Sequence, residues 1–224
     1  MSEAVALLGH TFVIKSIVSN PDGTQTLTTD NTYYLTERKR FSIGTDQYKV
    51  KSFVFNESIT VEKVGDAPNI TIQSFDLPAP YYKFGTVTST NIEVTQLYKS
   101  VSEVDRPLVF LLNPIVETEF YGGDREGQRD APLVLFFIDF SNYEDNLNVD
   151  FSELAIKPLS NVDCKLIELI QDGKAGCIGT LVNNSRRINH LRFAREDKNG
   201  EIMGIFSQSF SAIQRQLTLQ IKNC

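Results

Sequence analysis

The sequence predicts an α+β protein built from two domains. Residues 1–88 are expected to form a small N-terminal antiparallel β-barrel or sandwich. Residues 89–224 are expected to form an α+β domain with a mainly antiparallel sheet, two helices and a long β-hairpin. One observation behind this prediction is a series of short β-branched and aromatic runs, separated by turn sequences, in the first third of the chain. The other is that helical and strand patterns in the remainder are grouped rather than alternating, which favours an antiparallel sheet.

The composition is that of a globular protein with an acidic balance. Of 224 residues, 41% are hydrophobic and 22% are charged, so we expect a packed core. The net charge of −6 disfavours a protein that wraps nucleic acid, because such proteins neutralise phosphates with lysine and arginine. Neither a basic leader nor a long apolar segment opens the sequence, so we expect no signal peptide. Three cysteines without a close pair fit a reducing compartment, and we expect Cys164 to be a buried or half-buried free thiol.

The N-terminal domain is expected to consist of short antiparallel strands. Asn20–Gly23, with the sequence Asn-Pro-Asp-Gly, is a strong turn signal that joins the first two strands. Asn56–Ser58 and Gly65–Pro68 provide two further turns. Threonine, valine, isoleucine and tyrosine dominate the segments between these turns, which is typical of strands. The predicted strands are Thr11–Val18, Thr24–Thr29, Gln47–Phe55, Ile59–Val64 and Asn69–Phe75.

A Pro-rich segment, Asp76–Gly85, is expected to be an extended connector that carries exposed aromatic side chains. Beyond it the hydrophobic period changes to spacings of three and four residues, which is typical of an amphipathic helix. Thr90 is a candidate N-cap of this helix, and Pro107 stops it shortly after its end. The apolar positions of the predicted helix are Ile92, Val94, Leu97, Tyr98, Val101 and Val104.

The two most apolar runs of the chain, Leu108–Leu112 and Leu133–Phe140, are expected to be strands with both faces covered. Each run is too short to span a bilayer. The residues between the two runs are amphipathic and then charged, which predicts a long hairpin whose residues 113–133 project from the core. The tip of this hairpin, Gly122–Asp130, combines three glycines with five charged residues.

After the hairpin, the chain is expected to form one more helix and the closing strands of the sheet. Ser160–Asp163 resembles a capping box, and an apolar stripe predicts a helix over Asn161–Gln171 that ends at Gly173. The strands that follow are Cys177–Val182, a hairpin of His190–Arg195 with Glu201–Phe206, and Arg215–Ile221.

No pattern in the sequence indicates catalysis, so we expect a non-enzymatic protein without a cofactor or metal. The two histidines, His10 and His190, are far apart, and no cysteine or histidine pair has the spacing of a zinc site. No serine lies in a nucleophile elbow. The glycines at 173–179 follow a predicted helix instead of opening one, which disfavours a phosphate cradle. The acidic residues at 139–150 lack the spacing of an EF-hand.

The charged hairpin tip is the candidate functional site. Mixed charges on an extended arm give directional pairing, which is typical of a contact between subunits. A solvated loop without a partner is the alternative interpretation. The candidate interface residues are Asp124, Arg125, Glu126, Arg129 and Asp130 on the tip, with Arg186 and Arg187 as basic partners elsewhere in the chain.

The order of helix, long charged hairpin, helix and closing strands resembles the tail-terminator and neck (head–tail connector) ring proteins of tailed bacteriophages. The resemblance covers residues 90–224 and is carried by Pro107–Asn113, Gly122–Asp130, Pro132–Phe140 and Asn161–Gln171. It implies a virion structural protein, assembled in the host cytoplasm, that forms a sixfold or twelvefold homo-oligomeric ring. It also implies contacts with other tail or neck proteins, but with no membrane and no specific nucleic-acid sequence. The N-terminal β domain would be an addition to the compact terminator fold.

Two other functions fit the same sequence. A β-rich binding module could use the aromatic segment around Tyr81, Tyr82 and Phe84 to hold a peptide or glycan. A small enzyme would need a pocket that gathers His190 with two carboxylates.

Overall fold

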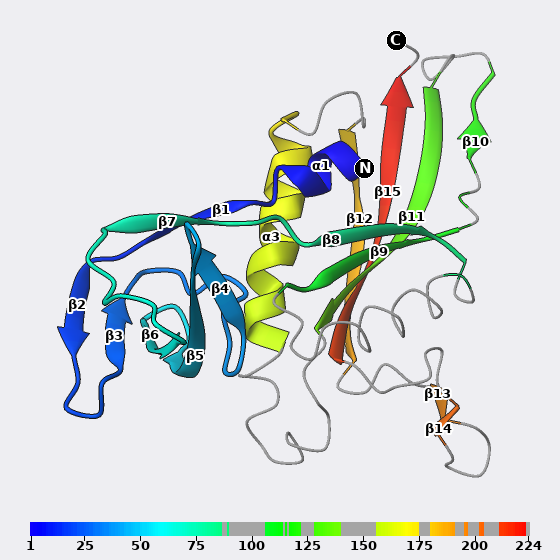
Figure 1. The fold of residues 1–224 in the computed structure, drawn as a ribbon. Helices are drawn as coiled ribbons and strands as arrows, with labels where there is room; N and C mark the ends of the chain where they lie inside the picture. Colours follow the sequence, from blue (N-terminus) through cyan, green and yellow to red (C-terminus); the bar gives the residue numbers. More distant parts are fainter. Residues whose placement is uncertain are drawn as a thin grey trace.

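The structure, a computed structural model, describes residues 1–86, 89, 106–113, 115, 117–121, 128–139, 156–174, 180–190, 195–196, 202–203 and 211–222. Its described part is mainly β, with antiparallel sheets and few helices, in agreement with the predicted α+β class (Figure 1). The helix predicted across residues 90–104 and the hairpin-tip residues 122–127 lie outside the described residues.

The first part of the chain forms one antiparallel sheet and a separate two-stranded ribbon. Among the described strands, the sheet has five members in the order β2-β3-β6-β5-β4, and β1 pairs with β7. The predicted turn at Asn20–Gly23 is confirmed, because the Asn20 amide donates to the Thr24 carbonyl and Gly23 has a φ of +82°. The bounds are β1 His10–Val13, β2 Ser16–Ser19, β3 Gln25–Thr28, β4 Arg40–Ile43, β5 Asp46–Val54, β6 Ser58–Val64 and β7 Ser74–Leu77.

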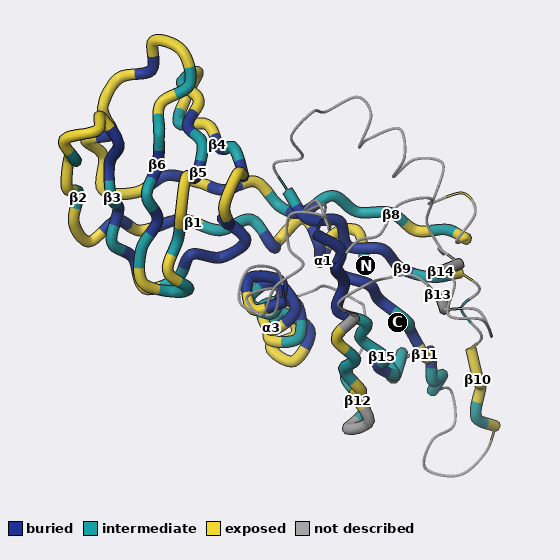
Figure 2. The backbone as a smooth tube through the Cα atoms, turned by 90° about the horizontal axis from the view of Figure 1, so that it is seen from below, coloured by how far each residue is buried: buried dark blue, intermediate teal, exposed yellow. Residues whose placement is uncertain are grey.

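Stacked aromatic rings join the ribbon to the sheet. Phe75 on β7 stacks on Phe12 at 4.9 Å and on Phe41 of β4 at 4.8 Å between ring centroids. Phe41 in turn stacks on Tyr48 of β5 at 5.6 Å. All four side chains are buried, so they form the centre of the N-terminal core. Figure 2 shows both buried and exposed stretches of backbone in this part of the chain. The finer prediction of a barrel or sandwich stays a prediction.

The second part of the chain is a larger sheet covered on one face by a helix. Its described strands run in the order β12-β15-β11-β9-β8, with β10 pairing to β11 outside this path. β8 is parallel to β9, and the other pairs are antiparallel. β13 and β14 pair with each other in a separate two-stranded sheet. The bounds of the remaining elements are α1 Ser2–Ala6, β8 Tyr81–Gly85, β9 Leu108–Leu112, β10 Thr118–Glu119, β11 Gln128–Asp139, α3 Lys157–Gln171, β12 Thr180–His190, β13 Arg195–Glu196, β14 Ile202–Met203 and β15 Ser211–Lys222.

Alternation along β9 and β11 explains why both runs are apolar throughout. Phe137 lies opposite Val109 and belongs to the main core beneath α3, whereas Phe136 lies opposite Phe110 in a second cluster on the other face. The prediction of strands covered on both faces is therefore confirmed for the described part of these runs. From α3, the residues Val162, Leu166 and Ile170 complete the main core.

Polar contacts from α3 join the two parts of the chain. The Asn161 amide nitrogen lies 3.2 Å from the Asn31 Oδ1, 3.2 Å from the Tyr33 carbonyl and 3.1 Å from the Asn56 Oδ1. Tyr33 and Asn56 both have a φ of +51°, a conformation that costs about 1 kcal/mol for a non-glycine residue. The segments around Tyr33 and Asn56 thus bring hydrogen-bond acceptors to Asn161 of α3. These contacts offset the cost of the left-handed backbone conformation.

The N-terminal segment closes the same junction. Ala4, Val5 and Leu8 are buried, and α1 contacts α3. The buried Tyr33 hydroxyl donates to the Leu8 carbonyl, and the Lys165 ammonium donates to the Gly9 carbonyl. A buried ion pair between Lys39 and Asp139 adds a second link, from the first part of the chain to the end of β11.

Several expectations were wrong in their details. The Ser160 hydroxyl donates to the Ile156 carbonyl instead of capping, because α3 begins one turn earlier, at Lys157, with a proline in its first turn. The expected connector at residues 76–85 contains β8, so the predicted boundary at residue 88 falls after a strand of the second sheet. Cys164 is exposed instead of buried or half-buried, because it faces away from the stripe of Val162 and Leu166.

We expect Phe137→Ala to lower the free energy of unfolding by about 3–5 kcal/mol, because it opens a cavity beneath α3. Phe84→Ala is the matched control, since the Phe84 side chain is 47% exposed. Urea unfolding measures both variants. An equal, small loss for both would show that β11 is not central to the core.

A second expectation concerns pH. Burial, and then the positive charge of Lys165, lower the pKa of His10, whose ring lies 4.6 Å from that of Tyr33. The folded state therefore favours neutral His10 and binds fewer protons than the unfolded state. The contribution of neutral His10 to stability is complete above the ordinary pKa of 6.5 and is lost as the pH falls through the lowered pKa of the folded state. We expect the stability of His10→Asn to depend less on pH between about 7.5 and 5. Melting temperatures are measured for both proteins across this pH range. An equal change of melting temperature with pH in the two proteins would contradict this expectation.

Candidate functional site

The end of the second sheet that lies away from the N-terminal sheet is a β-arm. β11 and β15 pair over twelve positions, from Gln128 opposite Lys222 to Asp139 opposite Ser211. β9 pairs only with residues 135–138 of β11 among the described strands. Residues 128–134 therefore extend past β9, over about 23 Å at 3.3 Å per residue. Figure 1 shows β10 beside this end of β11, near the C-terminal end of β15. We call residues 117–121, 128–134 and 216–222 the arm.

One face of the arm is held by the core. Ala131 and Leu133 on β11 lie opposite Leu219 and Leu217 on β15, and all four are buried. Alternate positions differ, since Pro132 is exposed and Val134 is half-buried. The arm is thus an amphipathic ribbon, and the predicted projecting hairpin belongs to the sheet at its base.

Charged groups line the outer part of the arm. The Arg129 guanidinium donates to the Glu117 carboxylate at 2.9 Å. The side chain of Arg129 is 34% exposed and that of Glu117 is 39% exposed. The Tyr121 hydroxyl donates to Glu119, and this hydrogen bond raises the pKa of Tyr121. The Tyr121 side chain is 86% exposed. A pair of carboxylates and an exposed aromatic ring therefore lie along one short segment.

The structure places the described members of the predicted interface on two different strands. Arg129 and Asp130 lie on β11 within the arm, where they pair with Glu119 and Thr118 of β10 in the strand register. Arg186 and Arg187 lie on β12, separated from β11 by β15, so this chain does not bring the two sets together. Asp124, Arg125 and Glu126 lie outside the described residues.

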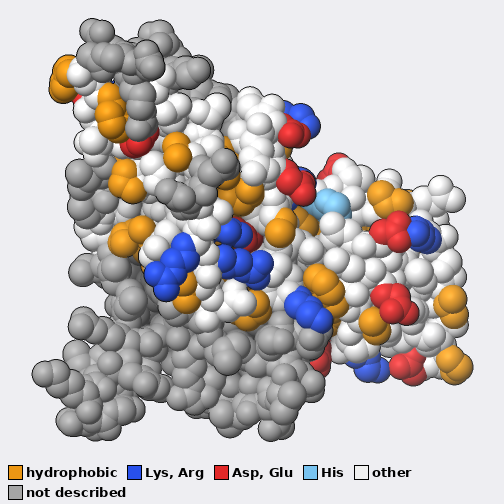
Figure 3. Space-filling model, turned by 180° about the vertical axis from the view of Figure 1, so that it is seen from behind, with side chains coloured by type: hydrophobic (Ala, Val, Ile, Leu, Met, Phe, Trp, Pro, Cys, Tyr) orange, Lys and Arg blue, Asp and Glu red, His pale blue; other side chains and the backbone are white. Residues whose placement is uncertain are grey.

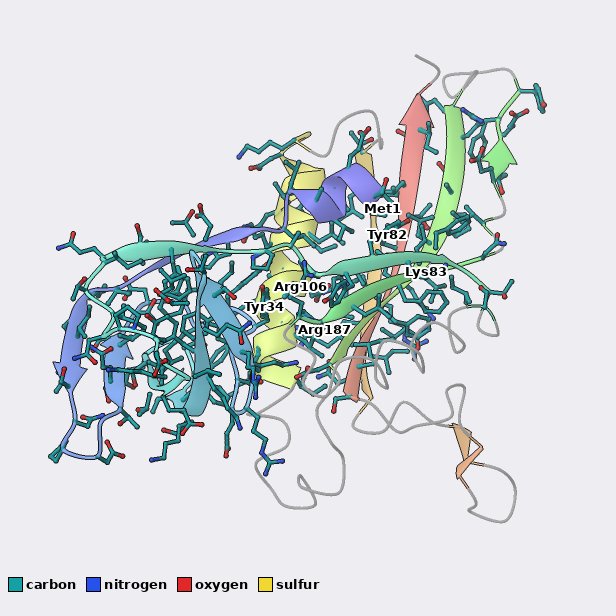
Figure 4. All side chains as sticks on the ribbon, viewed as in Figure 1. Met1, Tyr34, Tyr82, Lys83, Arg106 and Arg187 are labelled. Carbon is teal, nitrogen blue, oxygen red and sulfur yellow. The ribbon has the colours of Figure 1, made fainter. Side chains whose placement is uncertain are left out.

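Arg187 has a structural role inside the chain that the sequence analysis missed. It points from β12 toward α3 (Figure 4), donates to the Ser160 hydroxyl and lies 3.8 Å from the Asp163 carboxylate. Arg215 donates to both oxygens of Asp163, at 2.9 Å for its Nε. This bidentate contact raises the pKa of Arg215. Asp163 is fully buried, so the three charges hold α3 on the sheet.

Local sequence signals for this cluster were present but weak. Asp163 interrupts the apolar stripe of α3, and Arg215 interrupts the alternation between Ile213 and Leu217 on β15. A charge on the apolar face of an element indicates a buried partner. Glu117, Glu119 and Tyr121, by contrast, resemble ordinary residues of a polar loop.

The two tyrosines of the aromatic segment, Tyr81 and Tyr82, do not share a face of the sheet. Tyr81 packs against the cluster that contains Phe110 and lies under the Arg106 guanidinium at 4.1 Å, whereas Tyr82 packs against the main core. β8 thus distributes the two tyrosines to opposite faces of the sheet.

Within the described ranges, no group of three or more His, Cys, Asp and Glu residues is placed to hold a metal ion. No described helix is long and apolar enough to cross a membrane. No protein-family model, no curated protein and no solved structure matches this chain.

We expect Asp163→Asn to destabilise the fold by about 3–5 kcal/mol, because it leaves the Arg215 charge poorly compensated. The control is Asp172→Asn, whose carboxylate pairs with Lys174 at 2.8 Å on the exposed surface. Thermal and urea unfolding measure the difference. Comparable stabilities would mean that the cluster does not hold α3 in place.

Proposed function

We propose that this chain is a non-enzymatic virion structural protein that forms a homo-oligomeric ring at the head–tail junction or the tail end of a tailed bacteriophage. The observation that carries the proposal is the arm, a strand pair whose one face belongs to the core while its outer part presents charges and Tyr121 to the surface.

The arm has the physical properties of a contact between subunits. Its outer residues contribute little to the core of their own chain, because Thr118, Glu119 and Tyr121 are all exposed. An exposed tyrosine beside charged groups is typical of interface anchors, and the charges restrict the orientation of the partner. A rigid ribbon loses less entropy on binding than a loop of the same length.

The fold supports the same proposal. The described elements at residues 106–222 contain the strands, hairpin base and helix on which the resemblance to terminator and neck proteins rests. In this proposal the N-terminal part is an added small barrel or sandwich, with the β1–β7 ribbon as its cover. Its partners would be further copies of the chain and neighbouring neck or tail proteins, met during assembly in the host cytoplasm and retained in the virion.

The test is the mass of the purified protein by light scattering, together with electron micrographs of the same sample. We expect a closed ring with a mass of several times 25.2 kDa. A monomer at all concentrations, alone and in the presence of neighbouring tail proteins, would contradict the proposal.

A shortened arm provides a second test. The variant replaces residues 122–127 by Asn-Gly and carries Glu119→Ser and Tyr121→Ser. Its melting temperature should be nearly unchanged, because both replaced side chains are exposed and a shorter connection alters stability by only about 1 kcal/mol. We expect the assembly to weaken. Loss of folding would show instead that these residues serve the core.

A further inference from the structure

The segment that joins α1 to β1 is held by two hydrogen-bond donors from distant parts of the chain. The Lys165 ammonium of α3 donates to the Gly9 carbonyl, and the Tyr33 hydroxyl donates to the Leu8 carbonyl. Lys165 also lies over the Tyr33 ring, at 5.4 Å from its centroid. Figure 1 shows α1 beside α3, with β1 leading away from them toward the first sheet. These hydrogen bonds tie residues 1–9 to α3 and to the segment around Tyr33.

His10, the next residue, is half-buried against the same aromatic ring. Its ring centroid lies 4.6 Å from that of Tyr33, so His10 and Lys165 both lie against one side chain. Burial, and then the positive charge of Lys165, lower the pKa of His10. A second positive charge is therefore unfavourable at this position while Lys165 is in place. Figure 3 shows a histidine side chain (pale blue) at the surface between the two parts of the molecule, where protons can reach it.

The acidic groups on the neighbouring elements act on other partners. On β7, Asp76 accepts a hydrogen bond from a hydroxyl of β1 at 2.7 Å. On α3, the charge of Glu168 acts on Lys165, and on α1 the charge of Glu3 acts on the amino group of the first residue. The charge that acts on His10 is that of Lys165. Within the described part of the chain, protonated His10 thus meets a like charge and gains no carboxylate.

We propose that residues 1–9 form a pH-sensitive latch, which is closed on α3 while His10 is neutral and opens when His10 becomes protonated. The imidazolium repels the Lys165 ammonium across the Tyr33 ring. Lys165 is only half-buried, so its ammonium can move into water and leave the Gly9 carbonyl. The latch then loses its hydrogen bond to α3.

Opening of the latch uncovers apolar surface at the junction. Ala4, Val5 and Leu8 are buried in the closed state and belong to the main core. α1 has only five residues and no side-chain cap, so it does not stay helical away from α3. The N-terminal sheet keeps its stacked aromatic rings, and the Asp163 cluster still holds α3. Acidification therefore exposes the apolar residues of the latch while both sheets stay folded.

The test is amide hydrogen exchange of the full chain, measured by mass spectrometry at several pH values and corrected for the intrinsic exchange rate. The amides of Val5, Leu7 and Leu8 donate hydrogen bonds within the latch and report its opening. We expect their protection to fall by about threefold or more between about pH 7.5 and 5.5. The protection of β3 and β6 should change little over the same range.

Three variants separate the latch from a general effect of acid. H10N carries no charge at this position, so the protection of its latch should be independent of pH. K165M keeps the apolar stem over the Tyr33 ring but removes the ammonium. Its latch should be less protected at neutral pH, because the bond to Gly9 is lost, and should respond less to acid. K174M is the matched control, since Lys174 pairs with Asp172 on the exposed surface, and it should behave like the parent.

Melting curves check that each variant is folded. A parent protein whose latch is equally protected across the pH range would overturn the inference. An acid response that persists undiminished in H10N would also overturn it, because the titrating group would then lie elsewhere. Equal loss of protection in β3, β6 and the latch would show general unfolding in place of a local opening.

Discussion

The structure depends on the twelve-position pairing of β11 with β15. The inner half of β11 has both faces covered, with Phe137 against the core beneath α3 and Phe136 in the second cluster. The outer half continues the same register past the end of β9 and so becomes the arm. Side chains alternate between the two faces along the whole strand. The packing of Phe137 in the core therefore also determines on which face of β11 Arg129 lies. Burial at one end of the strand thus determines the chemistry at the other end.

Buried charges orient the elements around this strand pair. The Asp163 cluster joins α3 to β15 and β12, and the Lys39–Asp139 pair joins the end of β11 to the first part of the chain. Hydrophobic packing alone is tolerant of small rotations, whereas a bidentate arginine–carboxylate contact has one favoured geometry. The arm therefore has a defined direction relative to the N-terminal sheet, as the proposed subunit contact would require.

Local patterns in the sequence predicted the elements that local chemistry determines. Such patterns account for the turn at Asn20–Gly23, for the apolar pairing of β9 with β11 and for the end of α3 just before Gly173. Features that depend on distant residues were not predicted. The prolines before β8 indicate a connector, and only the pairing with β9 identifies this segment as a strand. Asp163 and Arg215 are 52 residues apart, so no local spacing relates them. For the candidate site, Arg129 and Asp130 lie on the arm as part of the predicted interface, while Arg187 is engaged by α3 because the fold brings β12 beneath that helix.

The central claim is that the arm is an assembly surface. Amide hydrogen exchange of the assembled protein, compared with the same protein dissociated by dilution or salt, measures this most directly. The account predicts slower exchange at residues 117–121 on assembly, with little change in β3 and β6 of the N-terminal sheet. Unchanged exchange on the arm in an assembled sample, with protection located elsewhere, would contradict it.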